Sequence, residues 1–360
     1  MGFNLQDYLS NGINNLVGDI AKASMHNPKA SLFMAQFALA NKISTEKRKD
    51  SEEKGEHIPP FLIASITTQC NLHCAGCYAR ANNGCIDGCS TEKLLSTDEW
   101  NRIFDEAEDL GISFILLVGG EPFMRPNVLK IAGNHKKILF PIFTNGTLLN
   151  ESGMKIIEQY QNLFPILSIE GNEITTDIRR GSGTYTKLSD SMVKLKKKSN
   201  VYGASITVQK NNLKEVMSDE FVYSLIDKGC KAVIYVEYVP VDKKTESNAP
   251  GDKERIYIKE RLEELRSKFK EMIFVAFPGD EEAIGGCLAA GRGFFHINPY
   301  GDAEPCPFSA YSDSSLKEMS LKEALHSPLF MKLQEKGLLQ EPHVGGCTLF
   351  QKEDTVKTLI

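Results

Sequence analysis

The sequence lacks a strong net charge, a long apolar run and a secretory signal, and each absence excludes a class of protein. A net charge of −5 gives no electrostatic argument for nucleic acid as the main partner. The most apolar early stretch, residues 30–40, is too short to span a bilayer and carries Gln36. The N-terminus has no basic stretch followed by an apolar core and a small-residue cleavage site. We therefore expect a soluble, cytoplasmic protein with no membrane or nucleic-acid partner.

Cysteine, however, is abundant. The chain has nine cysteines, an odd number that cannot all pair as disulfides, and five of them lie between Cys70 and Cys89. In a reducing compartment, clustered cysteines are more often metal ligands or catalytic groups than disulfides. The cysteines therefore predict a metal or redox centre.

Short apolar runs alternate with amphipathic segments in the middle of the chain. Six of these runs are candidate strands: residues 61–66, 114–118, 138–143, 165–169, 203–208 and 232–239. The clearest helix start between them is Ser96, with Glu99 three residues later as a capping box. Near-continuous apolar strands alternating with helices indicate a parallel sheet that helices cover. We predict an α/β fold, an incomplete (β/α)6 barrel, in which ligands bind at the C-terminal ends of the strands.

The alternation divides the chain into three regions. Residues 1–57 form a helical N-terminal extension, in which Asn27 and Pro28 mark a helix start and no peptide-binding module is recognisable. Residues 58–278 form the barrel. Residues 279–360, where Gly, Cys and turn residues are frequent, indicate a small metal-held appendage.

The first cysteine group has the spacing CxxxCxxC, directly after the first predicted strand. Cys70, Cys74 and Cys77 can hold three irons of a [4Fe–4S] cube, because each iron needs one outer ligand. The fourth iron then has no protein ligand. The amine and carboxylate of an amino acid can chelate that iron, and S-adenosylmethionine (SAM) supplies both groups.

Structural zinc is the alternative interpretation of the same segment. Cys74, Cys77, Cys85 and Cys89 supply four thiolates, enough for a tetrahedral zinc site in a binding protein without redox chemistry. A zinc ribbon, however, does not need to follow the first strand of a barrel. The position of the loop therefore favours the iron–sulfur interpretation.

Polar loops follow the next strands of the predicted barrel. GGEP at residues 119–122 combines glycines, which let a ligand approach the backbone, with a carboxylate that can help to hold an ammonium group. FTNG at 143–146 follows the third strand. SIEG at 168–171 places a hydroxyl and a carboxylate where a ribose could bind.

Together these segments resemble the radical SAM superfamily, over about residues 61–240. The matching motifs are CNLHCAGC at 70–77, GGEP at 119–122, SIEG at 168–171 and DIRRG at 177–181. The resemblance implies an enzyme that cleaves SAM reductively at a [4Fe–4S] cluster to begin radical chemistry on a substrate. An electron donor such as a ferredoxin or flavodoxin would reduce that cluster.

The resemblance also implies roles for individual residues. Cys70, Cys74 and Cys77 would ligate the cluster and serve as the catalytic cysteines. Gly119, Gly120 and Glu121 would face the methionine amino group, Ser168 the ribose and Arg180 the methionine carboxylate.

Relatives place an aromatic residue for adenine just before the third cysteine, where this chain has Gly76. The further candidates for cofactor binding are Tyr78, Asn145 and Glu170.

The second cysteine group consists of Cys287, Cys306 and Cys347. Residues 294–306 predict a hairpin that returns Cys306 to the neighbourhood of Cys287. The segment resembles the auxiliary-cluster appendages called SPASM and Twitch domains. Because the further cysteines of a full SPASM domain are absent, the shorter Twitch form fits better. This resemblance implies a second, auxiliary [4Fe–4S] cluster with three cysteine ligands.

The fourth iron of this auxiliary cluster has more than one interpretation. It could be open and bind substrate, or Cys85, Cys89 or Cys230 could close it. Alternatively, the three cysteines are simply buried without a ligand.

Two substrate classes fit these features. The Twitch-like appendage favours the side chain of a peptide or protein, whereas a three-ligand auxiliary site favours a small molecule of cofactor biosynthesis. Glu237, on the sixth predicted strand, is a candidate either for substrate contact or for a structural ion pair.

Overall fold

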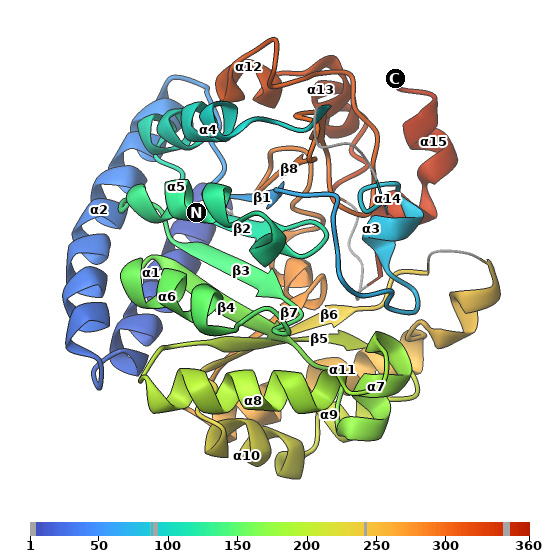
Figure 1. Ribbon diagram of the computed structural model, residues 1–360. Helices are drawn as coiled ribbons and strands as arrows, with labels where there is room; N and C mark the ends of the chain where they lie inside the picture. Colours follow the sequence, from blue (N-terminus) through green and yellow to red (C-terminus); the bar gives the residue numbers. More distant parts are fainter. Residues whose placement is uncertain (1–4, 87, 89–92, 241–242, 341–345) are drawn as a thin grey trace.

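One twisted sheet forms the centre of the computed structural model, which describes residues 5–86, 88, 93–240, 243–340 and 346–360 (Figure 1). Within these residues its strand order is β7-β6-β5-β4-β3-β2-β1-β8-β9, and the sheet is open. Every neighbouring pair is parallel except β8 with β9. The strands are β1 (Phe61–Ser65), β2 (Phe114–Val118), β3 (Phe140–Thr144), β4 (Leu163–Ser168), β5 (Gly203–Val208), β6 (Ala232–Glu237), β7 (Ile273–Phe277), β8 (His296–Ile297) and β9 (Ala303–Glu304).

The predicted fold class is confirmed, and among the described residues the structure adds a parallel strand that the sequence analysis missed. All six predicted strands are present, with ends that differ by at most two residues. The seventh, β7, pairs with β6 from Ala232↔Ile273 to Val236↔Phe277. Its sequence, IFVAF, is a short apolar run that follows a polar helix, so periodicity alone did not distinguish it from a helix end. The division of the chain at residues 57 and 278 stays a prediction.

Helices cover the outer face of the sheet between successive strands (Figure 1). They are α4 (Thr97–Leu110), α5 (Pro126–Asn134), α6 (Glu151–Gln159), α7 (Glu173–Arg180), α8 (Thr184–Lys197), α9 (Leu213–Val216), α10 (Asp219–Asp227) and α11 (Asp252–Lys268), with short 3₁₀ turns at Pro122–Met124, Lys243–Asn248 and Gly279–Ile284. The predicted capping box begins α4: Ser96 Oγ accepts from Glu99 N at 3.1 Å, and Ser96 N donates to the Glu99 carboxylate at 2.6 Å.

Two N-terminal helices, α1 (Leu5–Ala23) and α2 (Pro28–Glu53), close the end of the sheet where the strands begin. Ile13, Val17 and Phe37 pack there with Phe114 and Phe164, which lie at the starts of β2 and β4. The predicted helix start is confirmed, because the Asn27 side chain caps α2. The closed end leaves the opposite end, where the strands finish, for the site. No helix in the described part of the chain is both long and apolar enough to cross a membrane.

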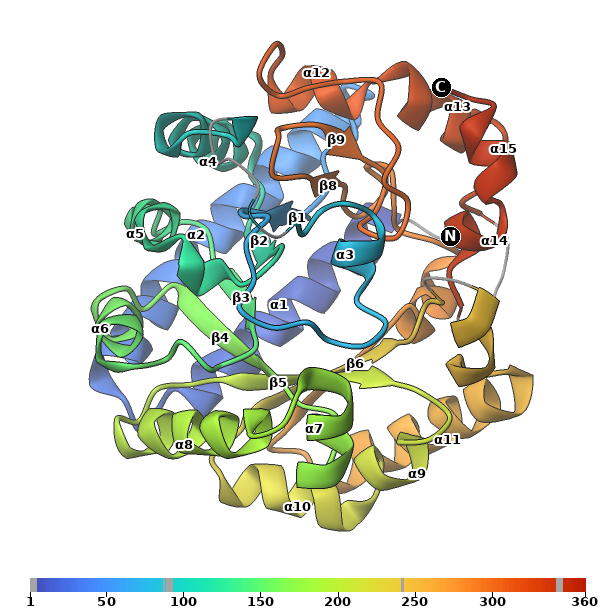
Figure 2. The same cartoon turned by 45° about the vertical axis from the view of Figure 1, so that its right-hand side comes forward.

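The C-terminal segment packs on the open side of β1 (Figure 2). The predicted hairpin is confirmed as β8 and β9, and β8 pairs with β1 through Ile63↔His296. The ring of Phe294, just before β8, lies 5.2 Å from that of Phe61 and 5.9 Å from that of Phe277. Phe294 therefore contacts both Phe61 of β1 and Phe277 of β7, two strands that are not neighbours in the sheet. Short helices follow: α12 (Leu321–Leu325), α13 (Pro328–Glu335), α14 (Thr348–Gln351) and α15 (Glu353–Lys357).

Candidate active site

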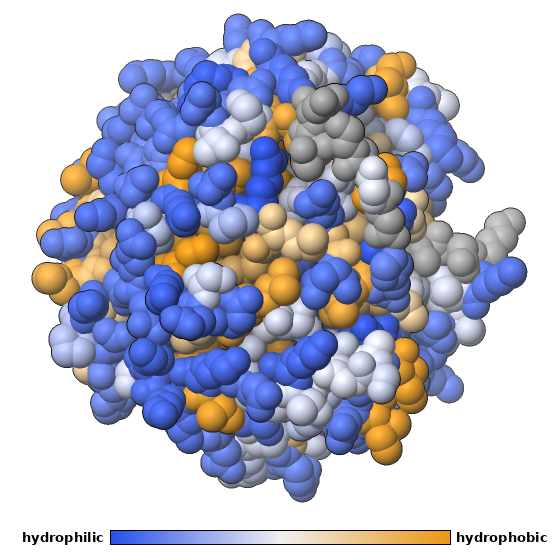
Figure 3. Space-filling view, in the orientation of Figure 1, coloured by the Kyte–Doolittle hydropathy of each residue, from blue (hydrophilic) through white to orange (hydrophobic). Residues whose placement is uncertain are grey.

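The loop that carries the first cysteine group, residues 66–77, crosses the C-terminal ends of the strands between β1 and α3 (Tyr78–Ala81) (Figure 2). Backbone hydrogen bonds tie it to the other predicted motifs: Gly120 N donates to Thr67 O at 2.8 Å, Glu121 N to Gln69 O at 2.7 Å and Ala75 N to Arg179 O at 2.8 Å. The structure thus brings the predicted cysteine, GGEP and DIRRG motifs into contact. In Figure 3, hydrophilic residues cover most of this view and hydrophobic residues gather near its centre, where Figure 1 shows the sheet.

Gly119 and Gly120 are required by the packing of this loop. A Cβ added at Gly120 would lie 2.0 Å from Gln69 O, and one at Gly119, where φ is +123°, would lie 2.6 Å from Thr67 O. Any side chain here would push the cysteine loop away. The expected contact of these glycines with the methionine amino group stays a prediction.

Cys70, Cys74 and Cys77 are free, half-buried thiols, and Cys77 is the residue from which α3 begins. Among the described residues, no three His, Cys, Asp or Glu side chains are placed to share one metal ion. A [4Fe–4S] cube does not need that convergence, because each iron takes its own outer ligand. The half-buried thiols on one loop fit such a cluster.

Cys85 lies beside Cys70, a contact that sequence reasoning did not find. Its buried thiol is hydrogen-bonded to Cys70, and this bond together with burial raises the pKa of the Cys70 thiol. The fourth cysteine of the zinc interpretation, Cys89, lies outside the described residues. Cys85 is therefore a residue of the first cysteine site and not of the second.

Arg180 lies between a buried carboxylate and the cysteine loop. Its Nε and Nη2 donate to Glu170 Oε1 at 2.8 and 2.5 Å, and its Nη1 is 3.9 Å from Cys74 Sγ. Arg179 Nη1 also donates to Glu170, at 2.6 Å, and Thr207 N donates to the other oxygen at 3.0 Å. Burial alone would lower the pKa of Arg180, but the charge of Glu170 and the Cys74 thiol raise it overall. Glu170 therefore fixes the guanidinium beside the cysteines.

Glu121 is directed inward, to the end of β3. Its carboxylate accepts from Thr144 Oγ1 at 2.7 Å, from Asn145 N at 2.8 Å and from Phe123 N at 3.1 Å. Burial raises the pKa of Glu121, and these hydrogen bonds oppose the shift. The carboxylate thus joins the loops after β2 and β3, in addition to any contact with an ammonium group.

Asn145 links the loop after β3 to the cysteine loop. Its Nδ2 donates to Asn71 Oδ1 at 2.9 Å, and Asn71 Nδ2 donates to Thr147 Oγ1 at 2.8 Å. Ser168 ends β4, where it pairs with Ser205 of β5, and its side chain is half-buried. Both residues lie at the predicted end of the sheet. Their contacts with SAM stay predictions.

Tyr238, just after β6, covers Gly76 and was missed by sequence reasoning. A Cβ added at Gly76, where φ is +65°, would lie 2.5 Å from the Tyr238 hydroxyl. That hydroxyl is buried and has no hydrogen-bond partner among the described residues. A tyrosine ring from the sixth strand therefore occupies the space where a side chain before the third cysteine would stand.

Helix α3, which follows the first cysteine group, packs on the loop that carries Cys306 of the second cysteine group. The Tyr78 ring lies 4.9 Å from that of Phe308 in an edge-to-face contact, and Asn82 Nδ2 donates to Pro307 O at 3.0 Å. Burial raises the pKa of Tyr78. Since Pro307 and Phe308 follow Cys306, this packing joins the two cysteine groups through α3.

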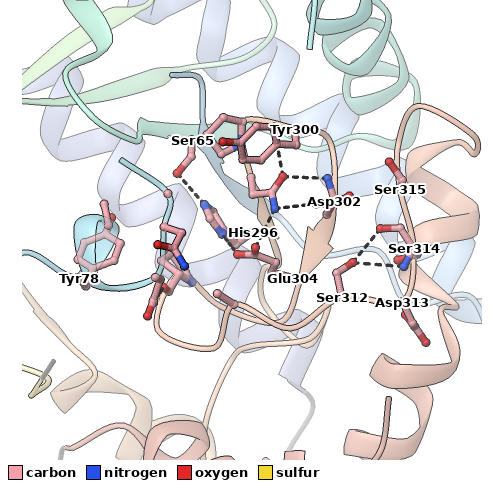
Figure 4. A pocket seen from close by; sticks show the side chains of 18 of the residues that line it. Ser65, Tyr78, His296, Tyr300, Asp302, Glu304, Ser312, Asp313, Ser314 and Ser315 are labelled. Atoms are coloured by element: carbon pink, nitrogen blue, oxygen red, sulfur yellow. Dashed lines mark hydrogen bonds and ion pairs between the residues drawn. The ribbon is translucent and has the colours of Figure 1, made fainter. Parts of the chain in front are cut away.

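A chain of polar side chains also connects β1 with the hairpin (Figure 4). Ser65 Oγ lies 2.8 Å from His296 Nε2, and His296 Nδ1 lies 2.7 Å from Glu304 Oε2. Asn298 Nδ2 donates to the other oxygen of Glu304 at 2.9 Å. These residues line a cavity of about 570 Å³ beside α3. The network fixes the hairpin that leads to Cys306 against the strand that leads to the first cysteine loop.

The second cysteine group comes together from three segments. Cys287 and Cys306 are buried and Cys347 is half-buried. The carboxylate of Glu281, 3% exposed, hydrogen-bonds to Cys287 and accepts from Leu288 N at 3.1 Å. Burial raises the pKa of all three thiols, and the charge of Glu281 adds to each shift. Sequence reasoning missed this glutamate, because no spacing motif marks it.

Glu237 forms the structural ion pair that was one of its two predicted roles. It accepts from Arg255 Nε at 2.9 Å and Nη2 at 2.7 Å, and from Gly346 N at 3.0 Å, which positions Cys347. Cys230 precedes the start of β6 and donates to Ala232 O at 3.1 Å, whereas Glu237 ends the same strand. Cys230 therefore lies at the far end of β6 and does not complete the second group.

Comparisons with known proteins agree with this geometry. The sequence model of the radical SAM superfamily matches residues 64–219. The chain is 29% identical over 307 residues to the AdoMet-dependent heme synthase of Methanosarcina barkeri, covering 77% of this chain and 85% of that protein. It is 23% identical over 307 residues to the antilisterial bacteriocin subtilosin biosynthesis protein AlbA of Bacillus subtilis, covering 82% and 66%.

A solved structure shares the fold. The crystal structure of Streptococcus suis SuiB bound to precursor peptide SuiA matches with a TM-score of 0.66 and 18% identity, covering 87% of this chain and 76% of that one. The motifs, the fold and these matches lead to one conclusion. A radical SAM superfamily domain occupies residues 64–219 of this chain, which is an enzyme that uses a [4Fe–4S] cluster and S-adenosylmethionine.

Proposed function

We propose that Cys70, Cys74 and Cys77 hold the SAM-binding cluster and leave its fourth iron for SAM. The observation that carries this proposal is the Arg180 guanidinium, 3.9 Å from the Cys74 thiol, on a loop whose three thiols are free and half-buried. When bound, the reduced cluster and SAM would supply the radical chemistry: an electron from the cluster would cleave SAM into methionine and a 5′-deoxyadenosyl radical, which would take hydrogen from the substrate.

The residues around the loop orient SAM in this proposal. Arg180, fixed by Glu170, presents a cation to the methionine carboxylate, and charge-assisted hydrogen bonds of this kind are strong. Glu121, whose carboxylate joins the loops after β2 and β3, would lie on the ammonium side of SAM in this proposal. The other contacts that we propose for SAM are made by Tyr78, Gly119, Gly120, Asn145, Ser168 and Glu170.

We propose an auxiliary [4Fe–4S] cluster at Cys287, Cys306 and Cys347. Three buried or half-buried thiols from separate segments fit the outer ligands of a cube, because each iron takes one. The packing of α3 on the Cys306 loop gives the two clusters a fixed relative position. A ferredoxin or flavodoxin would supply the electrons.

The substrate that we propose is the side chain of a peptide or protein. Support comes from the sequence similarity to AlbA, a bacteriocin biosynthesis protein, and from the shared fold with SuiB, which was crystallised with its precursor peptide. A small molecule of cofactor biosynthesis is the second candidate. The match to the heme synthase favours it, because that match spans 85% of the relative.

Reductive SAM cleavage tests the proposal. Anaerobically reconstituted protein with a chemical reductant should form 5′-deoxyadenosine, and the Cys70→Ala variant should form none. Cys230→Ala is the matched control, since this buried cysteine lies away from the site. Equal cleavage by Cys70→Ala and wild type would contradict the assignment. Transfer of deuterium into 5′-deoxyadenosine, from labelled peptides or from labelled tetrapyrroles, then separates the two substrate classes.

A further inference from the structure

Glu281 is a buried carboxylate placed among the three cysteines of the second group. It lies in the 3₁₀ turn Gly279–Ile284, and Gly286 N donates back to its carbonyl at 3.2 Å. This turn brings Glu281 Oε1 to Leu288 N, at 3.1 Å, and the carboxylate to the Cys287 thiol. The fold therefore directs the side chain toward the cysteines and away from water.

The site brings together four acidic side chains, three thiols and one carboxylate, each of a type that can ligate iron. Glu281 lies near enough to Cys306 and Cys347, as well as to Cys287, for its charge to act on each thiol. Among the described residues, Arg292 is a cation that acts on Glu281, and its Nη1 donates to Cys287 O at 2.5 Å and to Leu339 O at 3.0 Å. Burying anionic groups is costly unless a cation compensates them. Three thiolates and a carboxylate together suit a cationic metal core.

We propose that Glu281 is the fourth protein ligand of the auxiliary [4Fe–4S] cluster, alongside Cys287, Cys306 and Cys347. This inference rests on the proposed auxiliary cluster. A carboxylate oxygen is an established ligand type for iron, and here it would serve the iron that the three thiolates leave. The cysteines considered for that position are placed elsewhere or not described: Cys230 lies at the far end of β6, Cys85 contacts Cys70, and Cys89 is outside the described residues.

A closed ligand set has a functional consequence. With all four irons ligated by protein, no iron is left for direct attachment of the substrate. The auxiliary cluster would then act by exchanging electrons, and the substrate would be held by side chains. The substrate of this enzyme therefore need not carry a group that ligates iron.

The test uses a chain in which only the auxiliary cluster can form. Cys70, Cys74 and Cys77 are all changed to Ala, and the reconstituted protein should retain about four irons per chain, one cube. Glu281→Gln in this background should change the electron paramagnetic resonance (EPR) spectrum of the reduced cluster and raise its reduction potential, because one negative ligand is lost. Added cyanide should leave the spectrum of the Glu281 protein unchanged and alter that of the Glu281→Gln protein, whose fourth iron is open.

Asp280→Asn is the matched control, because Asp280 lies on the same turn but its carboxylate binds Arg266. It should leave the spectrum unchanged. If Glu281→Gln lost iron, Glu281→Asp, which keeps the oxygen donor, should restore it, and failure to do so would overturn the assignment. A cyanide response with Glu281 intact, or a Glu281→Gln spectrum identical to the control, would also overturn it. If the triple-Ala chain held no iron at all, the auxiliary cluster itself would be rejected.

Discussion

Arg180 lies against Cys74, with its Nη1 3.9 Å from the cysteine sulfur, and Glu170 holds it there through two further nitrogens. Glu170 and Arg180 belong to the loop after β4 and to α7, whereas Cys74 lies on the loop after β1. The carboxylate thus sets the position of a cation at the cysteine loop from across the sheet. This relationship makes Glu170 a positioning residue.

Glu170→Gln should weaken SAM binding while leaving iron content unchanged. The variant removes the charge that orients Arg180, and a hydrogen bond to a charged group contributes about 1.5–3 kcal/mol, so the Kd for SAM should rise about tenfold or more. Equilibrium dialysis of the reconstituted protein with SAM measures the effect. Glu173→Gln, on the exposed first turn of α7, the helix that carries Arg180, should leave the Kd unchanged. An unchanged Kd in Glu170→Gln would remove the positioning role.

Cys85→Ala should leave SAM cleavage intact. The proposed function needs an open fourth iron, so Cys85 must not ligate it although it contacts Cys70. The EPR signal of the reduced cluster should shift on addition of SAM to the same extent in the variant and the wild type. A cluster that binds SAM only after Cys85 is removed would show that this cysteine, and not SAM, closes the cube.

The same substitution should change the reactivity of Cys70 in reduced, cluster-free protein. The hydrogen bond to Cys85 raises the pKa of Cys70, which lowers the thiolate fraction at a given pH, and the thiolate is the nucleophile. Iodoacetamide should therefore label Cys70 faster in Cys85→Ala than in wild type, as mass spectrometry of the peptides can show. The modification rate of Cys230 in the same samples is the internal control.

Gly76→Ala should destabilise the protein and reduce iron loading. The substitution places a Cβ 2.5 Å from the Tyr238 hydroxyl at a backbone φ of +65°. Backbone strain at positive φ costs about 1–2 kcal/mol, and overpacking adds about 1–3 kcal/mol. Gly55→Ala separates the two effects, because Gly55 also has a positive φ but an added Cβ there meets nothing within 4 Å.

Melting temperature and iron per chain are the two measurements for this series. Adding Tyr238→Ala to Gly76→Ala should recover the part of the loss that is due to overlap. If Gly76→Ala behaved like Gly55→Ala, the Tyr238 ring would not constrain the cysteine loop.

The sequence predicted the features that local patterns encode. The apolar runs located six strands, the Ser96 and Glu99 pair marked the start of α4, and loops at successive strand ends were brought together by the parallel topology. The contacts that sequence reasoning missed join residues far apart in the chain. Tyr238 on Gly76, Cys85 beside Cys70, and Glu281 among its three cysteines depend on how loops pack, and neither periodicity nor motif spacing records that packing.

The stability of cluster-free protein should fall between about pH 6 and pH 8 because of Glu281. Burial raises the pKa of Glu281 from 4.5 to about 8, so in this range the folded protein holds a proton that the unfolded chain has released. Stability then decreases as pH rises, because the unfolded state binds fewer protons than the folded state. The contribution of Glu281 to the free energy of unfolding is therefore present at low pH, and it is lost as the pH rises through the folded-state pKa.

Thermal melting of the cluster-free protein at the two pH values measures this contribution. Glu281→Gln cannot ionise and should flatten the pH dependence of the melting temperature, whereas Asp280→Asn should keep it. Protein reconstituted with iron and sulfide should also lose this part of the dependence if Glu281 is a ligand, because a carboxylate bound to iron no longer takes up the proton. A slope that survived reconstitution, in protein shown to hold the auxiliary cluster, would mean that the carboxylate is not bound to iron.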